Sequence, residues 1–167
     1  KTGITTFFIE PKVDTGAILL QEKIIINDDD DFGSLSKKVM VKGATLMLRT
    51  LDKIEDGTIQ TINQNSDLAS LAPKIRKKMY KIDWSLTAQK INNKIRALSP
   101  LPGAFTTLNG KRIKIFKSKV LIGEQSTGSG KISFLEKNRM AISCGEGELE
   151  IIEIQIANKS RMSMEAC

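Results

Sequence analysis

The stretch from Lys74 to Gly103 divides this chain into two parts with different sequence patterns. It begins with residues 74–81, which carry five positive charges and no negative one. It continues with apolar residues at a helical period over 88–98, ahead of prolines that block further helix. Residues before the stretch mix strand-like and helix-like patterns, whereas residues after it alternate between strands and turns. The sequence therefore predicts two domains, residues 1–80 and residues 81–167.

The first part, residues 1–80, has the mixture of strands and a helix that is typical of an α/β domain. β-prone runs lie near 4–9 and 22–26, and a helical apolar period extends over 33–55. Gly57 is suited to end this helix, because glycine readily adopts the left-handed conformation of a C-terminal cap. We expect an incomplete α/β unit that exposes apolar surface. The apolar positions expected on one helix face are Leu35, Val39, Leu46, Leu51 and Ile54.

The second part reads as a β domain over residues 104–157. Asn109-Gly110 stands between two alternating runs, which is a strong signal for a hairpin. Near the end of the chain, Leu149 and Ile151 share one face of the expected strand, whereas Ile152, Ile154 and Ile156 share the other. This change of face indicates a bulge or a strong bend. Five strands of this size predict a small Greek-key β-barrel, OB-fold-like, with a two-sheet sandwich as the alternative. The expected strands are 104–108, 111–122, 131–136, 139–144 and 148–157.

Positive charge is concentrated in the second part of the chain. The net charge is +7, and residues 82–167 hold 13 Lys and Arg against 8 Asp and Glu. A basic domain suggests a polyanionic partner, and ordinary solubility charge is the alternative interpretation. Such side chains would neutralise phosphates without reading base sequence, and a solvated strand face is the alternative for Lys114 and Lys117. The candidate nucleic-acid-binding residues are Lys74, Arg76, Lys77, Lys78, Lys111, Arg112, Lys114 and Lys117.

Asp14 is the sharpest candidate for chemistry. It lies between an apolar run and a Thr-Gly turn, where Gly16 would allow a tight turn and the close approach of a ligand. A half-buried carboxylate at this place could hold a proton, orient an imidazole or stabilise an ammonium group. The alternative is an aspartate that accepts backbone hydrogen bonds within its own turn.

Several classes of protein are disfavoured by composition. No apolar run approaches the roughly 20 residues of a membrane-spanning helix. Cys144 and Cys167 are too few for a disulfide framework or a metal site, so no metal is expected. The chain contains no His, the usual proton carrier at neutral pH.

Six short motifs, taken in order and at their spacing, resemble the methionyl-tRNA formyltransferase family. The motif Val13–Leu19 with its Asp-Thr-Gly element and the motif Ile-Asp-Trp-Ser at 82–85 are the most specific. The resemblance covers nearly the whole chain. The motifs lie at 2–5, 13–19, 82–85, 95–97, 102–105 and 161–163.

The resemblance implies a partial Rossmann-like formyltransferase domain followed by an OB-like barrel. It implies transfer of a formyl group from 10-formyltetrahydrofolate to the amino group of methionyl initiator tRNA in translation initiation. It further implies a cytoplasmic enzyme that is monomeric when full length. Asp14 would be the catalytic aspartate, and the folate-side loop would consist of Val13, Asp14, Thr15 and Gly16.

The resemblance also implies an Asn and a His that should lie upstream of Asp14. This chain begins with Lys1 inside a strand-like pattern and has neither that motif nor any His, so we expect a fragment that is inactive by itself. Glu-Pro-Lys at 10–12 departs from the family pattern. Two alternatives remain, a sugar-nucleotide formyltransferase and a non-enzymatic nucleic-acid-binding barrel. The first would not need a basic barrel, and the second gives no reason for the Asp-Thr-Gly element.

Overall fold

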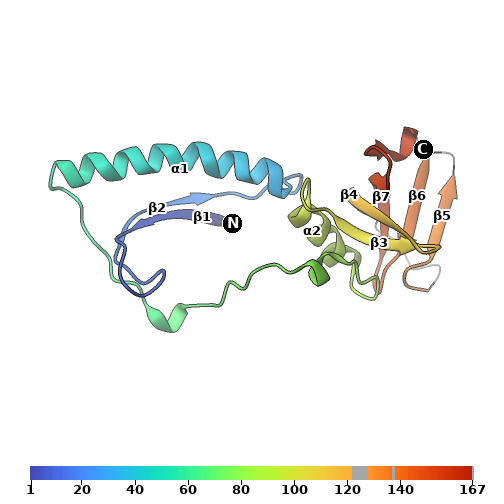
Figure 1. Cartoon of the computed structure of the whole chain (residues 1–167), viewed down its shortest axis with the longest axis horizontal. Helices are drawn as coiled ribbons and strands as arrows, with labels where there is room; N and C mark the ends of the chain where they lie inside the picture. The colour runs from blue at the N-terminus through green and yellow to red at the C-terminus, as the bar shows by residue number, and fades with distance from the viewer. Residues whose placement is uncertain (122–127, 137, 167) are drawn as a thin grey trace. The chain divides into compact units, whose positions relative to one another are not determined.

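The computed structural model describes residues 1–121, 128–136 and 138–166, and it shows a mixed α/β chain with two compact units (Figure 1). The first unit comprises Lys1–Asp30 and Ser34–Lys74, and the second comprises Asp31–Gly33 and Ile75–Cys167. Among the described residues, no helix is long and apolar enough to cross a membrane.

The first unit pairs two antiparallel strands with a long helix. Its elements are β1 (Thr2–Phe7), β2 (Ile18–Ile24), α1 (Phe32–Glu55) and the 3₁₀ turn η1 (Ser66–Leu68). The hydroxyl groups of Thr6 on β1 and Thr50 on α1 share a hydrogen bond of 3.0 Å. Leu19, Ile24 and Leu46 form the apolar part of this interior.

The helix expected over 33–55 is confirmed, but the strands differ from the expected 4–9 and 22–26. β1 ends at Phe7, so the apolar Phe8 and Ile9 lie outside it, and β2 runs without a break from Ile18. The β-propensity of Phe8 and Ile9 reflects their apolar side chains, whereas the length of a strand depends on its partner. The pairing of β1 with β2 stops at the pair Phe7 and Ile18.

The first unit exposes apolar surface, as expected. On α1, Leu46 is buried, but Leu51 is 54% exposed and Ile54 is 40% exposed. The helical period was therefore correct, and only part of the predicted face is covered. Together with β1 and β2, these side chains border a groove of about 460 Å³. The groove is lined by Thr5, Thr6, Phe7, Phe8, Ile9, Leu19, Met47, Thr50, Leu51 and Ile54.

The second unit packs one helix against one antiparallel sheet. The helix α2 begins where Thr87 accepts a hydrogen bond from the backbone of Lys90, which makes Thr87 its N-cap. Its buried residues Ile91, Ile95 and Leu98 meet the inner face of the sheet. The elements are η2 (Lys77–Tyr80), α2 (Ala88–Leu98), β3 (Ala104–Leu108), β4 (Lys111–Leu121), β5 (Ile132–Glu136), β6 (Arg139–Ser143), β7 (Glu148–Ile156), β8 (Met162–Ser163) and η3 (Met164–Ala166).

The predicted strands, the hairpin and the change of parity are confirmed. Asn109 and Gly110 both have positive φ, of 49° and 75°, as a two-residue hairpin loop requires. In the pairing of β4 with β7, Phe116 and Ile152 have no partner, so the register shifts there and the buried parity changes. Residue 122, the expected end of the second strand, lies outside the described residues.

The barrel itself is not confirmed. The sheet has the order β3-β4-β7-β6-β5, with β8 paired to β7, and no pairing between β3 and β5 closes it in the part of the chain that the structure describes. The two-sheet sandwich is also wrong, because these strands belong to a single sheet. Local strand and turn signals fix each hairpin, whereas closure depends on the tilt and stagger of all strands together.

Candidate functional site

Asp14 lies in an exposed loop between β1 and β2. Its backbone has a positive φ of 56°, a conformation that aspartate tolerates better than most residues. The side chain is exposed, which corrects the expected half-buried carboxylate. Among the described residues, no hydrogen-bond donor contacts the Asp14 carboxylate, so turn capping by this side chain is not observed.

Gly16 is required by the packing of the loop. A Cβ atom at Gly16 would lie 1.6 Å from the carbonyl oxygen of Phe8, so any side chain would collide with the neighbouring backbone. Next to it, the backbone N–H of Phe8 donates to the carbonyl oxygen of Ala17 at 3.1 Å. Thr15 also stabilises the loop, since its hydroxyl donates to the carbonyl oxygen of Lys12 at 3.0 Å. Val13, by contrast, is 83% exposed.

Gln64 contacts this loop from a distant part of the sequence, and sequence reasoning missed it. Its amide nitrogen donates to the carbonyl oxygens of Asp14, at 3.0 Å, and Gly16, at 2.7 Å. Residues 58–73 look irregular, and their polar composition gives no period that would single out one side chain. The available signal was Ile62, an apolar residue two positions earlier that pairs with Ile18 of β2.

The second candidate site is a basic hollow in the second unit. The backbone N–H of Ile82 donates to the carbonyl oxygen of Phe105 on β3 at 2.8 Å, which places η2 beside the β3–β4 hairpin. A hollow of about 380 Å³ results, with four cationic side chains at its wall. Its lining residues are Lys77, Lys78, Tyr80, Pro102, Gly103, Phe105, Arg112 and Lys114.

Packing orders the cations that β4 contributes to this hollow. The Arg112 guanidinium lies 4.2 Å above the centre of the Phe105 ring, a cation–π contact that covers one ring face. Gly103, with φ of 86°, leaves room for the stem of Lys114, whose Cδ would be 3.2 Å from a Cβ at Gly103. Phe116 is buried, so it offers no surface for stacking on bases.

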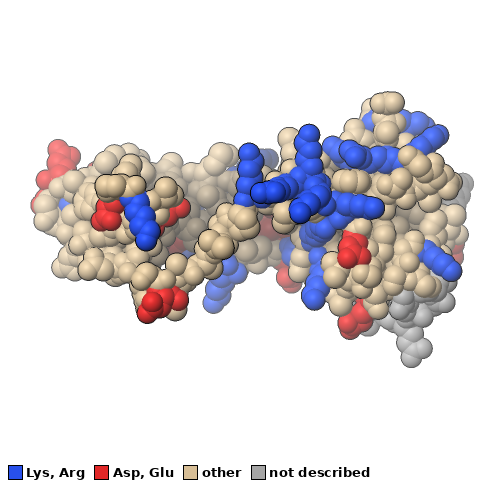
Figure 2. All heavy atoms as spheres, turned by 60° about the horizontal axis from the view of Figure 1, so that its bottom comes forward, with Lys and Arg blue, Asp and Glu red and all other residues tan. Residues whose placement is uncertain are grey.

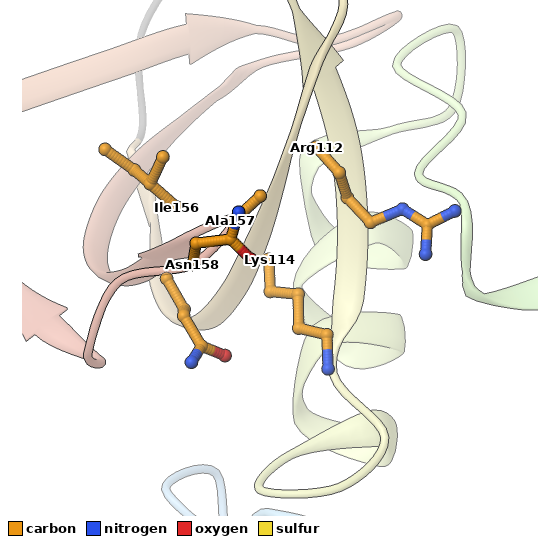
Figure 3. Close-up of a pocket in the computed structure, with 6 residues that line it drawn as sticks. Arg112, Lys114, Ile156, Ala157 and Asn158 are labelled. Atoms are coloured by element: carbon orange, nitrogen blue, oxygen red, sulfur yellow. The ribbon is translucent and has the colours of Figure 1, made fainter.

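Arg112 and Lys114 also border a second hollow, of about 190 Å³, formed with Gln155 to Asn158. In Figure 3 their side chains leave β4 in different directions, that of Lys114 toward the side where Asn158 lies. β4 therefore presents positive charge to two adjacent hollows. Figure 2 shows Lys and Arg side chains gathered over the second unit.

The other predicted basic residues do not join the hollow. Lys117 lies opposite Glu153 in the register with β7, and Glu153 is itself paired with Arg161. Lys111 and Arg76 are exposed and do not line the hollow of about 380 Å³. Lys74 belongs to the first compact unit.

The motif at 82–85 is structural within the second unit. The Trp84 indole N–H donates to the hydroxyl of Thr106 on β3 at 3.0 Å. The hydroxyl and the backbone N–H of Ser85 donate to the Asp83 carboxylate, at 2.6 and 3.1 Å, and lower its pKa.

Burial raises the pKa of the Cys144 thiol to about 11. In the described ranges, no three His, Cys, Asp or Glu side chains gather as they would around a metal ion.

Comparison with known families places this arrangement in context. The profile described as "Formyl transferase, C-terminal domain" matches residues 74–167. The sequence is 41% identical to the methionyl-tRNA formyltransferase of Carboxydothermus hydrogenoformans over 168 aligned residues, which cover 99% of this chain and 54% of that relative. The chain thus spans about half the length of the curated relatives it matches.

The fold is shared with solved structures of other proteins. HypX from Aquifex aeolicus in complex with tetrahydrofolic acid has a TM-score of 0.70 at 19% identity, covering 97% of this chain and 29% of HypX. The N-formyltransferase from Helicobacter canadensis, in complex with folinic acid and dTDP-3-aminofucose, has a TM-score of 0.69 at 25% identity. The alignment covers 89% of this chain and 54% of that enzyme.

Proposed function

This chain belongs to the formyl transferase family, and we propose that its residues form the C-terminal half of a methionyl-tRNA formyltransferase. The enzyme would transfer the formyl group of 10-formyltetrahydrofolate to the amino group of methionyl initiator tRNA, in the cytoplasm and as a monomer, for translation initiation. Residues 1–80 would be the end of the catalytic domain with its linker, and residues 81–167 the C-terminal domain. The observation that carries the proposal is the 41% identity over 99% of the chain.

In this proposal Asp14 is the catalytic aspartate. Its exposed carboxylate, unpartnered within the described residues, is available to orient and charge-stabilise an imidazole supplied by the other half of the enzyme. An Asn and that His would polarise the formyl oxygen while the amine attacks the formyl carbon. Val13 is exposed and could contact the folate, whereas Thr15 and Gly16 hold the loop in shape.

The basic hollow would hold the tRNA backbone. Lys77, Lys78, Arg112 and Lys114 are its cationic wall residues, and we propose that they contact phosphates and carry no base specificity. Lys74, Arg76, Lys111 and Lys117 lie outside its wall and would contribute through longer-range attraction. An aromatic platform is poorly supported, since Arg112 covers one face of Phe105 and Phe116 is buried.

The test is a formyl-transfer assay with the full-length enzyme that contains these residues. It compares three acceptors: methionyl initiator tRNA, methionyl elongator tRNA and a dTDP-amino sugar, each with 10-formyltetrahydrofolate as donor. We expect transfer to the initiator tRNA with a clear preference over the elongator. No transfer to either tRNA would contradict the proposal.

A sugar-nucleotide formyltransferase is the second candidate, because the Helicobacter canadensis enzyme shares the fold. In that case the amino sugar would be formylated and the lysines of the hollow would be solvated surface. Salt-independent binding of tRNA, or none at low salt, would favour this second candidate. A binding module without catalysis would bind tRNA and formylate none of the acceptors.

A further inference from the structure

The amide side chain of Gln64 forms hydrogen bonds with the Asp14 loop, although the two are distant in sequence. The Nε2 atom of Gln64 lies 3.0 Å from the carbonyl oxygen of Asp14 and 2.7 Å from that of Gly16. A primary amide nitrogen carries two N–H groups, so a single side chain can donate to both carbonyls at once. Two peptide planes of the loop are thereby fixed by one residue 50 positions away from Asp14.

The backbone around Gln64 is itself anchored. Ile62 and Ile18 exchange two backbone hydrogen bonds, of 2.8 and 2.9 Å, which extend the β1–β2 pair by one bridge. This anchor is two residues before Gln64 and lies at the start of β2. The amide therefore reaches the loop from a support that belongs to the sheet.

Other parts of the loop have internal contacts, whereas the Asp14 carboxylate has no hydrogen bond among the described residues. Gly16 packs against Phe8, and Thr15 donates to the carbonyl oxygen of Lys12. The Asp14 side chain has no hydrogen-bond partner among the described residues. Its direction is thus set by its backbone, which has a φ of 56° and a carbonyl held by Gln64.

We propose that Gln64 is a positioning residue for Asp14 in formyl transfer, which rests on the proposed function. Gln64 holds the Asp14 carbonyl so that the carboxylate meets the imidazole in its productive orientation. Small errors in the placement of a catalytic group reduce the rate of the chemical step more than they reduce substrate binding. The role of Gln64 should therefore appear in kcat and not in KM.

The experiment measures formyl transfer to initiator tRNA in the full-length enzyme carrying Gln64→Glu. Glutamate keeps the size of the side chain but replaces both donors with acceptors that face two carbonyl oxygens. We expect kcat to fall by about tenfold to a hundredfold with KM for tRNA nearly unchanged. Gln64→Asn, which keeps the donors but is one methylene shorter, should lose a comparable factor.

Gln21→Ala is the matched control. Gln21 is an exposed amide on the neighbouring strand, and its Nε2 donates to the Thr5 hydroxyl at 3.1 Å, away from the loop. This variant should keep kcat and the melting temperature. A loss of kcat in Gln21→Ala equal to that in Gln64→Glu would overturn the inference, because any lost hydrogen bond of the unit would then have the same effect.

A double-mutant cycle separates positioning from a purely structural role. When Asp14→Asn has already removed the charge, Gln64→Glu should cause no further loss of turnover. Independent, multiplicative losses would overturn the inference, as would normal kcat in Gln64→Glu while Asp14→Asn is impaired. Normal turnover in Asp14→Asn is a different result, which removes the proposed catalytic role of Asp14 and the inference with it.

Discussion

The backbone N–H of Ile82 lies 2.8 Å from the carbonyl oxygen of Phe105, and this bond joins two basic segments that are far apart in sequence. A parallel bridge between Lys81 and Phe105 accompanies it. On one side of the bond stands the η2 turn and on the other the β3–β4 hairpin. Their cations consequently line one hollow, where the summed potential exceeds that of either segment alone.

Removing the cations of this hollow should weaken tRNA binding in a salt-dependent way. Arg112→Ala and Lys114→Ala should each reduce the slope of log affinity against log salt by about one, without changing the ratio between initiator and elongator tRNA. Fluorescence titration of labelled tRNA over a salt series measures both quantities.

Lys119→Ala is the control for this experiment. Lys119 lies on the same strand and is exposed, but it stands opposite Glu150 and outside the hollow. Its removal should change the slope much less. Equal effects of Lys119 and Lys114 would mean that net charge, and not the hollow, governs binding.

Asp14→Asn should abolish most turnover and leave the fold intact. The side chain is exposed and makes no hydrogen bond within the described residues, so its charge contributes little to packing. We expect the rate of single-turnover formyl transfer to fall by orders of magnitude, while the melting temperature and tRNA affinity stay close to those of the parent. Asp56→Asn changes an exposed carboxylate of the same unit and should leave all three quantities unchanged.

Asp30 should make the stability of the first unit depend on pH below about 4. Hydrogen bonds from Lys38, from the backbone of Asn27 and from Ser34 lower its pKa from 3.8 to about 2. A carboxyl with a lowered folded-state pKa stabilises the fold above its unfolded pKa, and that contribution is lost as pH falls from about 4 toward 2. Asp30→Asn should therefore lower the melting temperature at pH 7, with a smaller difference at pH 3. Asp29→Asn, an exposed neighbour, should show no such dependence.

Gly103 and Gly110 form a matched pair for separating backbone strain from crowding. Both have positive φ, but a Cβ at Gly103 would lie 2.9 Å from the Phe116 ring, whereas a Cβ at Gly110 meets nothing within 4 Å. Gly110→Ala should cost about 1 kcal/mol of unfolding free energy through strain alone. Gly103→Ala should cost about 3 kcal/mol, because overpacking is added. Denaturant unfolding gives both values, and equal costs would show that the ring yields freely.

Elements with strong local signals could be predicted from the sequence. The helical periods of α1 and α2 and the Asn109-Gly110 turn depend on residues within a few positions of one another, and each appears in the structure. The change of parity between Ile151 and Ile154 also has a local cause, the unpaired Ile152. These local elements are present in the structure because tertiary packing favours the same conformation as the local sequence.

Features that depend on distant backbone positions could not be predicted. The hydrogen bond from Gln64 to the Asp14 carbonyl joins residues 50 positions apart. Its acceptor is a backbone carbonyl, which every residue has, so the sequence carries no signal for it. The exposure of Asp14 could not be foreseen, because apolar runs lie on both sides of its turn, at 7–9 and 17–20. Likewise, proximity in sequence grouped Lys117 with Lys114, but the bulge at Phe116 lies between them and places Lys117 opposite Glu153.

The bulge in β4 limits how relatives of this chain can vary in length. On either side of Phe116 the strand faces the core with different parity, so the loss or gain of one residue between Ile113 and Ser118 would turn Arg112 and Lys114 toward the helix. The Asn109-Gly110 tip has no such restriction, since it meets nothing nearby. Insertions and deletions among homologous chains should therefore collect at the tip of this hairpin and be absent from its basic strand.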